Sequence, residues 1–300
     1  MVDLTIITPS LNHGAYVAEA IGSVARSDGG TIQHIVIDGG STDATVAMLE
    51  PFLSRITFVS RPGLGSHEAI NLAMDMARGQ IVGFLNADDY YEPGALDLVI
   101  ETFRTHPDAE ALCGGMRFFE SAANGMSTTT LRGHLDPPDL LLELTLGAPG
   151  FNSWFFRRTC LEETFPLDAD LNFSADRDFL LKIFWRTTPL IVRELLYHYR
   201  IHEGSRTLRP DRSTRRAIAC EHMNVARRHI ALHPPNSPAA RLLAAWWCLE
   251  WARCLAAGGV CAIRPPFPPF AALPRAIRAR RRMMRLFDAQ SPRQRRHPRS

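Results

Sequence analysis

The sequence predicts an α/β protein with a mostly parallel sheet flanked by helices and a helical extension at its C-terminal end. Short runs rich in β-branched residues alternate with stretches of about 10–15 residues that have helical periodicity, which is typical of βαβ units. The stretch 81–91 combines a buried-strand pattern with two carboxylates, Asp88 and Asp89, near its end. Beyond residue 206, helical patterns lead to an arginine-rich end.

The first half of the chain supports this fold class element by element. The expected strands are short apolar runs, at Leu4–Thr8, Ile32–Ile37, Ile56–Ser60 and from Ile81 onward. The helices between them are indicated by apolar residues at helical spacing, namely Val17, Ile21 and Val24, then Val46, Leu49 and Phe52, then Ala69, Leu72, Ala73 and Met76. Asn12 is expected to cap the first helix, and Pro93 to begin a fourth that carries Leu96, Val99, Ile100 and Phe103.

Acidic residues follow two of these strands where each strand must end. Asp38 comes directly after the second strand, and Asp88 and Asp89 come after the strand at Ile81. The carboxyl ends of parallel strands meet at one edge of a sheet, where ligands bind. Adjacent carboxylates there favour a divalent cation such as Mg²⁺ or Mn²⁺, which commonly brings phosphates with it. The sequence therefore predicts a nucleotide-diphosphate pocket with a metal; the alternative is an Asp-Asp turn that caps the next helix.

Composition narrows the class of protein. The chain of 300 residues is 46% hydrophobic and 22% charged, which is ordinary for a soluble globular protein with one large domain or a domain and an appendage. Its net charge of +3 hides ten Arg and one Asp within residues 275–300, whereas the preceding chain is mildly acidic. Six Cys without a CxxC pair and an N-terminus unlike a signal peptide predict reduced thiols in a cytoplasmic protein.

The middle third is less regular. Strands are expected at Ala111–Phe119 and Trp154–Arg158, with a loop rich in Ser, Thr and Gly at 121–133. A helix is expected to begin near Ser174 and to place Asp176 in its first turn, with Asp178 pointing elsewhere.

Four stretches resemble the family 2 glycosyltransferases, which have a GT-A fold. They are Ile6-Ile7-Thr8-Pro9-Ser10-Leu11-Asn12, Val36-Ile37-Asp38-Gly39-Gly40-Ser41-Thr42-Asp43, Gly65 with Ala69-Ile70-Asn71, and Leu85-Asn86-Ala87-Asp88-Asp89. The resemblance implies inverting transfer of a sugar from a nucleotide-diphosphate sugar, with Mn²⁺ or Mg²⁺, to a saccharide or lipid-linked saccharide acceptor. It also implies a place in bacterial surface polysaccharide or glycolipid biosynthesis.

The same resemblance implies roles for individual residues. The donor would be bound by Thr8, Pro9, Asn12, Asp38, Gly65, Asn71, Asn86, Ala87, Asp88 and Arg200, with Asp38 bonded to the base and Arg200 to the diphosphate. Asp88 would be the main metal ligand, with Asp89 nearby and His202 as an extra ligand of metal or phosphate; alternation would put Arg200 and His202 on one strand face. One departure is Asn86, which replaces the first acid of the family's DxD motif and supplies a neutral oxygen.

Inverting transfer needs one base that takes the proton of the acceptor hydroxyl as that oxygen attacks the anomeric carbon. Asp176 matches the Asp of the family's second acidic motif, although Ala175 replaces the preceding Glu. The alternative is that Asp176 only favours the start of a helix, as acidic residues commonly do.

The C-terminal part departs from the family pattern. Helices are expected at 213–232 and 239–257, and Glu250 and Arg253 interrupt the tryptophan-rich run of the second, so a membrane-spanning helix is not expected. After a break at Pro265–Pro269, residues 275–300 form a basic amphipathic pattern, which indicates either contact with an anionic membrane surface or a soluble basic tail. Nothing else in the sequence indicates nucleic-acid binding.

The expected organisation is a donor half at residues 1–115, an acceptor-side half at 116–206 and a helical extension at 207–300. Two alternatives to an active glycosyltransferase stay open. A nucleotidyltransferase would need a Gly-rich basic phosphate loop after the first strand, but the segment Pro9–Gly14 carries no Lys or Arg. A degenerate nucleotide- or glycan-binding protein would account for Asn86 and Ala175.

Overall fold

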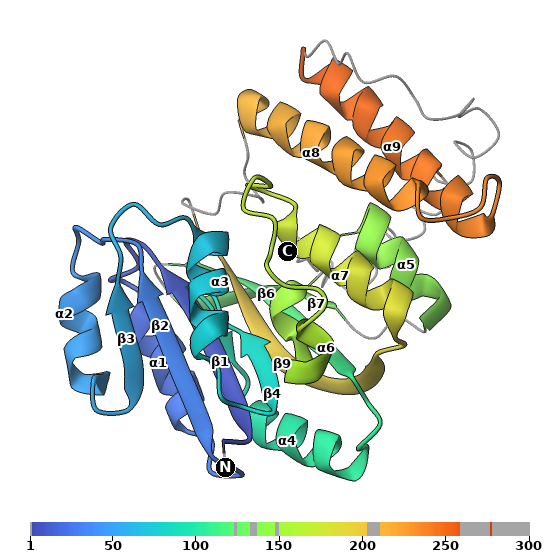
Figure 1. Cartoon of the computed structure of the whole chain (residues 1–300). Coiled ribbons are helices and arrows are strands. Elements are labelled where there is room, and N and C mark those ends of the chain that lie inside the picture. The colour runs from blue at the N-terminus through green and yellow to red at the C-terminus, as the bar shows by residue number, and fades with distance from the viewer. Residues whose placement is uncertain are drawn as a thin grey trace, which may run out of the picture.

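The computed structural model describes residues 2–122, 125–132, 137–147, 150–202 and 211–258, together with Ile277. The expected break at Pro265–Pro269 and the basic segment 275–300, apart from Ile277, lie outside the described residues. One mixed sheet runs through the protein, with helices packed on it and a pair of C-terminal helices at one end (Figure 1).

The N-terminal half of the sheet is parallel, as the sequence predicts. Its strands follow the order β3-β2-β1-β4 and comprise β1 (Leu4–Ser10), β2 (Ile32–Asp38), β3 (Ile56–Ser60) and β4 (Ile81–Phe84). Successive side chains of a strand point to opposite faces of a sheet. Accordingly, Ile7 packs in one cluster with Ala73 of α3 (Ser66–Met76), whereas Ile6 packs in another with Val24 of α1 (Val17–Ala25). Both faces of the parallel strands are thus covered, as βαβ units require.

The sheet then continues with strands of mixed direction. The order β4-β8-β6-β9-β5 contains β8 (Trp154–Arg157), β6 (Ala111–Ala122), β9 (Leu190–Ile201) and β5 (Tyr90–Tyr91). β8 runs antiparallel to both β4 and β6, whereas β9 runs parallel to β6. Gly83 in β4 allows the ring of Phe155 in β8 to approach, because a Cβ at this glycine would lie 2.6 Å from the ring carbon Cε1.

The expectation of a loop at 121–133 is wrong. The end of β6 pairs antiparallel with β7 (Gly125–Arg132), so residues 121–122 and 125–132 of this segment are in strands rather than in a loop. Its composition of Ser, Thr and Gly suggested a loop, but the run of Thr within it is β-branched and suits a strand that has a partner. The expected boundary between the two halves of the catalytic domain, at 115/116, falls within β6.

The expected helices of the first half are present. Besides α1 and α3 they include α2 (Thr45–Leu49), the 3₁₀ turn η1 (Glu50–Phe52) and α4 (Ala95–Thr105). The expectation that Asn12 caps α1 is wrong, because α1 begins only at Val17 and Tyr16 is its first flanking residue. The Oδ1 atom of Asn12 instead accepts the backbone N–H of Thr42 at 2.8 Å, so this side chain joins two loops at the edge of the sheet.

The remaining helices lie beyond the parallel strands. They are α5 (Pro137–Leu146), which the sequence did not predict, η2 (Phe151–Ser153), α6 (Arg158–Leu161) and α7 (Ala175–Arg186). α8 (Arg212–Ile230) and α9 (Pro238–Ala256) confirm the two predicted C-terminal helices and pack beside α5 and α7 (Figure 1). Trp246 and Trp247 of α9 are fully buried in the same cluster as Phe179 of α7. Across the described ranges, every helix is too short or too polar to span a membrane.

Candidate active site

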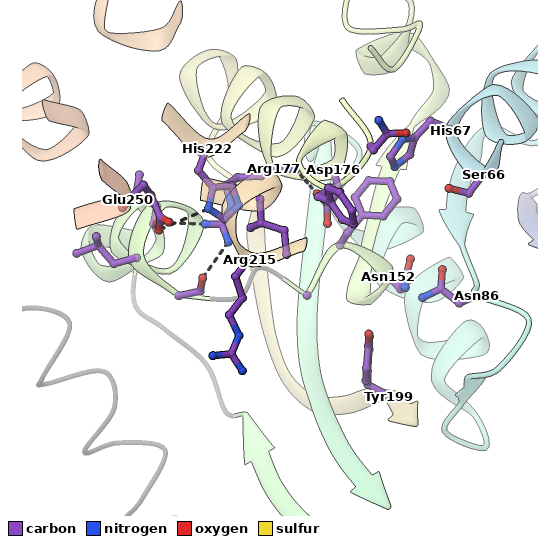
Figure 2. Close-up of a pocket in the computed structure, with 18 of the residues that line it drawn as sticks. Ser66, His67, Asn86, Asn152, Asp176, Arg177, Tyr199, Arg215, His222 and Glu250 are labelled. Carbon is purple, nitrogen blue, oxygen red and sulfur yellow. Dashed lines mark hydrogen bonds and ion pairs between the residues drawn. The ribbon is translucent and has the colours of Figure 1, made fainter. Parts of the chain in front are cut away.

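A cavity of about 870 Å³ opens between the carboxyl edge of the parallel strands and the C-terminal helices. Side chains from distant parts of the chain line it: among them are Pro9 of β1, His67 of α3, Asn86 after β4, Asp176 of α7, Tyr199 of β9 and Arg215 of α8 (Figure 2). Ligand pockets typically have volumes of about 300–1,000 Å³, so this cavity can hold a ligand as large as a nucleotide sugar.

Asp38 shapes the loop that follows β2. Its fully buried carboxylate accepts the backbone N–H groups of Gly40 and Ser41, each at 3.0 Å, the Ser60 hydroxyl at 3.1 Å and the Ser41 hydroxyl. Gly40 has a φ of +93°, and a Cβ there would lie 2.7 Å from the Cα of Pro62, so the turn requires glycine. Asp38 therefore lies at the edge expected for a nucleoside, with its oxygens already bonded to this loop.

Of the expected residues of β1, Pro9 lines the cavity and Thr8 does not. The Thr8 hydroxyl lies 2.8 Å from Nε2 of His34 in the neighbouring strand, and both side chains are buried. Burial lowers the pKa of His34 to about 3, so the imidazole is neutral. Thr8 thus helps hold β1 to β2 rather than facing the cavity.

Gly65 and Asn71 lie at α3 but contact protein groups. The backbone N–H of Gly65 donates to Glu68 Oε2 at 2.7 Å, which closes the first turn of the helix. The amide of Asn71 donates to the carbonyl of Leu167 at 2.9 Å and accepts that residue's N–H at 2.8 Å. The α3 residues that line the cavity are instead Ser66, His67 and Ile70.

Asp88 and His202 form the most accessible pair of metal-ligating groups at this edge. Oδ2 of Asp88 lies 2.9 Å from Nε2 of His202, and their side chains are 20% and 18% exposed, respectively. A carboxylate oxygen suits Mn²⁺ and Mg²⁺, and an imidazole nitrogen is a common metal ligand in proteins. Within the described ranges no third His, Cys, Asp or Glu joins them in a cluster, so further ligands would come from phosphates or water.

Asp89 is enclosed by donors from the protein. At 1% exposure it accepts the Tyr197 hydroxyl and the backbone N–H of Arg200, each at 2.7 Å, and the Asn86 amide at 3.0 Å. Burial and the nearby Asp88 carboxylate raise the pKa of Asp89 well above its usual range, against the effect of these donors. Its two oxygens therefore tie β9 to the turn that precedes β5. Ala87, in the same turn, is buried against α1.

Arg200 supports the Asp88 turn from the side. Its guanidinium donates to the carbonyl oxygen of Asp88 at 2.8 Å and pairs with Glu19, and the side chain is 7% exposed. It also lies over the rings of Phe119, at 4.6 Å from the centroid, and Tyr16, at 4.9 Å. Arg200 and His202 both contact Asp88, Arg200 at its backbone carbonyl and His202, just after β9, at its carboxylate.

Asp176 lines the cavity from the first turn of α7, where it is half-buried and accepts the backbone N–H of Arg177 at 2.7 Å. The residues before it are held by Glu221 of α8, whose carboxylate accepts from three groups within residues 172–174. Asp178 points elsewhere, as predicted, and its carboxylate lies 2.8 Å from Nζ of Lys182 and 3.1 Å from Nε2 of His229.

Sequence reasoning missed the part of the cavity that α7, α8 and α9 build. The Arg177 guanidinium is buried and donates to the carbonyls of Thr145 at 3.0 Å and Gly147 at 2.9 Å, which fixes the C-terminal end of α5. The α8 and α9 residues lining the cavity include Arg212, Arg215, His222, Glu250 and Arg253. No sequence signal identified them, because they come together only when the C-terminal helices pack on α7.

The acidic residues lie at the carboxyl edge of the parallel strands, where open α/β sheets bind ligands, and sequence comparison identifies the family. Residues 5–165 match the model of glycosyl transferase family 2. This match covers more than half of the chain, so the protein belongs to that family.

Individual relatives agree with this assignment. Bacillus subtilis EpsH is 24% identical over 213 residues, which are 67% of this chain and 62% of EpsH. The PGL/p-HBAD biosynthesis glycosyltransferase of Mycobacterium tuberculosis is 27% identical over 200 residues, which are 64% of this chain and 73% of that protein. The matching region therefore spans less than two thirds of the length of EpsH.

Solved structures share the fold. Residues 1–349 of Staphylococcus aureus TarS superpose with a TM-score of 0.58 at 18% identity, over 96% of this chain and 83% of that one. The mannosyltransferase PcManGT of Pyrobaculum calidifontis, solved with GDP-Man and Mn²⁺, gives a TM-score of 0.57 at 16% identity, over 96% of this chain and 86% of that one. The predicted GT-A fold class is confirmed by these neighbours.

Proposed function

We propose that the protein is an inverting glycosyltransferase that moves a sugar from a nucleotide-diphosphate sugar to an acceptor hydroxyl. The observation that carries the proposal is that Asp176 and Asn86 line one cavity from different elements (Figure 2). Two residues after Asn86, the Asp88 carboxylate lies 2.9 Å from His202. A solved TarS structure holds UDP, and PcManGT holds GDP-Man and Mn²⁺, which supports a nucleotide-sugar donor here.

The donor would lie along the carboxyl edge of the parallel strands. The loops held by Asp38 and Asn12 would border its nucleoside, and Asn86 would contact its ribose or phosphate side. Asp88 and His202 would hold Mn²⁺ or Mg²⁺, which supplies positive charge to the leaving diphosphate when bound. Arg200 would keep the Asp88 turn in place through its hydrogen bond to the Asp88 carbonyl.

The acceptor would approach from the side of α7. There the Asp176 carboxylate takes the proton of the acceptor hydroxyl while that oxygen forms a bond to the anomeric carbon and the bond to the diphosphate oxygen breaks. A single displacement of this kind inverts the anomeric configuration. Because backbone N–H of Arg177 occupies Oδ1 of Asp176, the other oxygen is the natural site for the proton.

The biological setting is part of the proposal. A saccharide or lipid-linked saccharide acceptor fits surface polysaccharide or glycolipid biosynthesis, and the relative from Mycobacterium tuberculosis is named a PGL/p-HBAD biosynthesis glycosyltransferase. We also propose that residues 1–115 form the donor half of the catalytic domain and residues 116–206 its acceptor half. Residues 207–300 would form the helical extension. Contact of residues 275–300 with the cytoplasmic face of an anionic membrane is kept as a proposal as well.

Calorimetric titration with UDP, GDP, CDP and dTDP, each with and without Mn²⁺, tests the proposal. We expect one nucleotide to bind tightly only with the metal, followed by transfer from the corresponding nucleotide sugar with inversion, as read by NMR of the product. Binding without any turnover, unchanged in Asp176→Asn, would identify a degenerate nucleotide-binding protein instead. Binding of none of the four would refute the donor site.

A further inference from the structure

Asn152 lies at a place in the cavity that packing fixes from two sides. It belongs to η2, whose first residue, Phe151, stacks on Phe84 at the end of β4 with ring centroids 4.6 Å apart. The Phe151 ring also meets Phe179 of α7 edge to face, at 5.8 Å. η2 is therefore held between the carboxyl edge of the parallel strands and the helix that carries the proposed base.

The side-chain amide of Asn152 has no hydrogen-bond partner among the described residues, although the residue is only 8% exposed. Its neighbour Ser153 is satisfied locally, because its hydroxyl donates to the carbonyl of Gly150 at 2.9 Å. Elsewhere at this edge the amides of Asn71 and Asn86 both bond to protein groups. Most buried polar side chains have such partners, so the exception at Asn152 calls for an explanation.

The amide of Asn152 opens into the cavity. Asn152 lines the cavity, and its amide atoms reach the cavity surface instead of being enclosed by protein. In the view of Figure 2 this side chain lies beside Asn86 and below Asp176. Asn86 belongs to the proposed diphosphate side of the donor and Asp176 is the proposed base, so the sugar to be transferred has to lie between them. The amide is thus within the stretch of cavity that this sugar would occupy.

We propose that the Asn152 amide binds a hydroxyl group of the transferred sugar and so sets part of the donor preference. The inference rests on the proposed function, because it takes the donor to lie between Asn86 and Asp176. An amide both donates and accepts hydrogen bonds without carrying a charge, which matches a sugar hydroxyl, whereas a carboxylate or phosphate would favour an arginine in this place. A sugar without the matching hydroxyl would leave the amide unpaired, at a cost in affinity.

Calorimetry with the full chain and Mn²⁺ tests the inference in two steps. The first titrates the wild type with UDP-glucose, UDP-galactose, GDP-mannose, CDP-glucose and dTDP-glucose and identifies the compound that binds best. The second uses the parent nucleoside diphosphate and a set of deoxy analogues of that compound, each lacking a different one of the free hydroxyl groups of its sugar. The variant is Asn152→Leu, which keeps a similar volume and removes the amide. The control is Asn224→Leu, which changes a half-buried asparagine of α8 outside the described cavity lining.

We expect one deoxy analogue to bind the wild type at least about tenfold more weakly than the complete sugar nucleotide. Asn152→Leu should bind the same two compounds within about twofold of each other, because the partner of that hydroxyl is gone. Affinity for the nucleoside diphosphate, which has no sugar to transfer, should be equal in both proteins, and the control should behave like the wild type. Urea unfolding checks that each variant folds; if Asn152→Leu does not, Asn152→Ser, which lacks the reach of the amide, takes its place.

Two results would overturn the inference alone. In the first, every analogue loses the same factor in affinity in Asn152→Leu as in the wild type. In the second, Asn152→Leu weakens the nucleoside diphosphate as much as the sugar nucleotide, which would assign Asn152 to the nucleotide. Failure of the proposed function looks different, because the wild type then binds none of the nucleotides or sugar nucleotides, which refutes the donor site and the inference together.

Discussion

Replacement of Glu221 by Ala tests whether α8 positions the end of α7 that carries Asp176, the proposed base. The Glu221 carboxylate accepts the N–H groups of Asn172 at 3.1 Å and Phe173 at 2.8 Å, and the Ser174 hydroxyl at 3.1 Å. Ser174 is fully buried, whereas Asn172 is exposed and can bond to water after the change. A buried donor without a partner costs about 1–3 kcal/mol, and the half-buried Phe173 N–H loses its partner as well as Ser174, so we expect the free energy of unfolding to fall by about 2–4 kcal/mol.

The same substitution should slow transfer. Asp176 follows Ser174 by two residues, and a displacement of about 1 Å in a reacting group can cost about 100-fold in rate. Urea unfolding measures the stability, and kcat with the donor identified by titration measures the rate. Nucleotide affinity should stay the same, because the Glu221 carboxylate accepts its hydrogen bonds from residues 172–174, which lie away from the donor edge.

Glu162→Ala is the matched control for Glu221→Ala. Its side chain is 62% exposed and lies 4.0 Å from Arg158, so its loss should change stability by less than about 1 kcal/mol and leave kcat intact. The reasoning is refuted if Glu221→Ala unfolds like the control, or if it weakens nucleotide binding as strongly as it lowers kcat.

Four further changes test separate parts of the structure. Asp176→Asn should lower kcat by about 10²- to 10⁴-fold and keep nucleotide affinity; turnover near the wild-type rate would place the base elsewhere. Asp88→Ala should abolish the Mn²⁺-dependent part of nucleotide binding in calorimetry, and full Mn²⁺-dependent affinity would remove the metal assignment. Between pH 6.5 and about 3 only the unfolded chain binds a proton at His34. As the pH is lowered through that window, the free energy of unfolding should therefore decrease by up to about 1.4 kcal/mol per pH unit. In urea unfolding, His34→Gln should lack this part of the pH dependence. Deletion of residues 275–300 should lower binding to anionic liposomes in a sedimentation assay, whereas equal binding by both forms would argue for a soluble tail.

The sequence predicted the parallel strands and their carboxyl edge because these depend on local patterns. Apolar β-branched runs and acidic strand ends identified β1 to β4 and brought Asp38 and Asp88 to one edge. Side-chain roles were harder to predict, because they depend on partners far away in the sequence. Asn71 bonds to Leu167, 96 residues later, and Asp89 bonds to the backbone of Arg200, 111 residues later. Such pairs follow only from the assembled fold. For the same reason the α8–α9 wall of the cavity could not be predicted.

The departure at Asn86 has a physical explanation in the network around Asp89. The Nδ2 atom of Asn86 donates to Oδ2 of Asp89 at 3.0 Å, and the same oxygen accepts the Tyr197 hydroxyl at 2.7 Å. An aspartate at this position would set two carboxylates against each other in a buried site, and one would have to hold a proton. The amide supplies a donor there instead, which helps keep Asp89 bonded to β9 and the Asp88 turn in place. The neutral residue thus removes one charge from the proposed metal site while it stabilises the turn that presents Asp88 to His202, so the loss of the acid alone does not indicate a loss of the proposed chemistry.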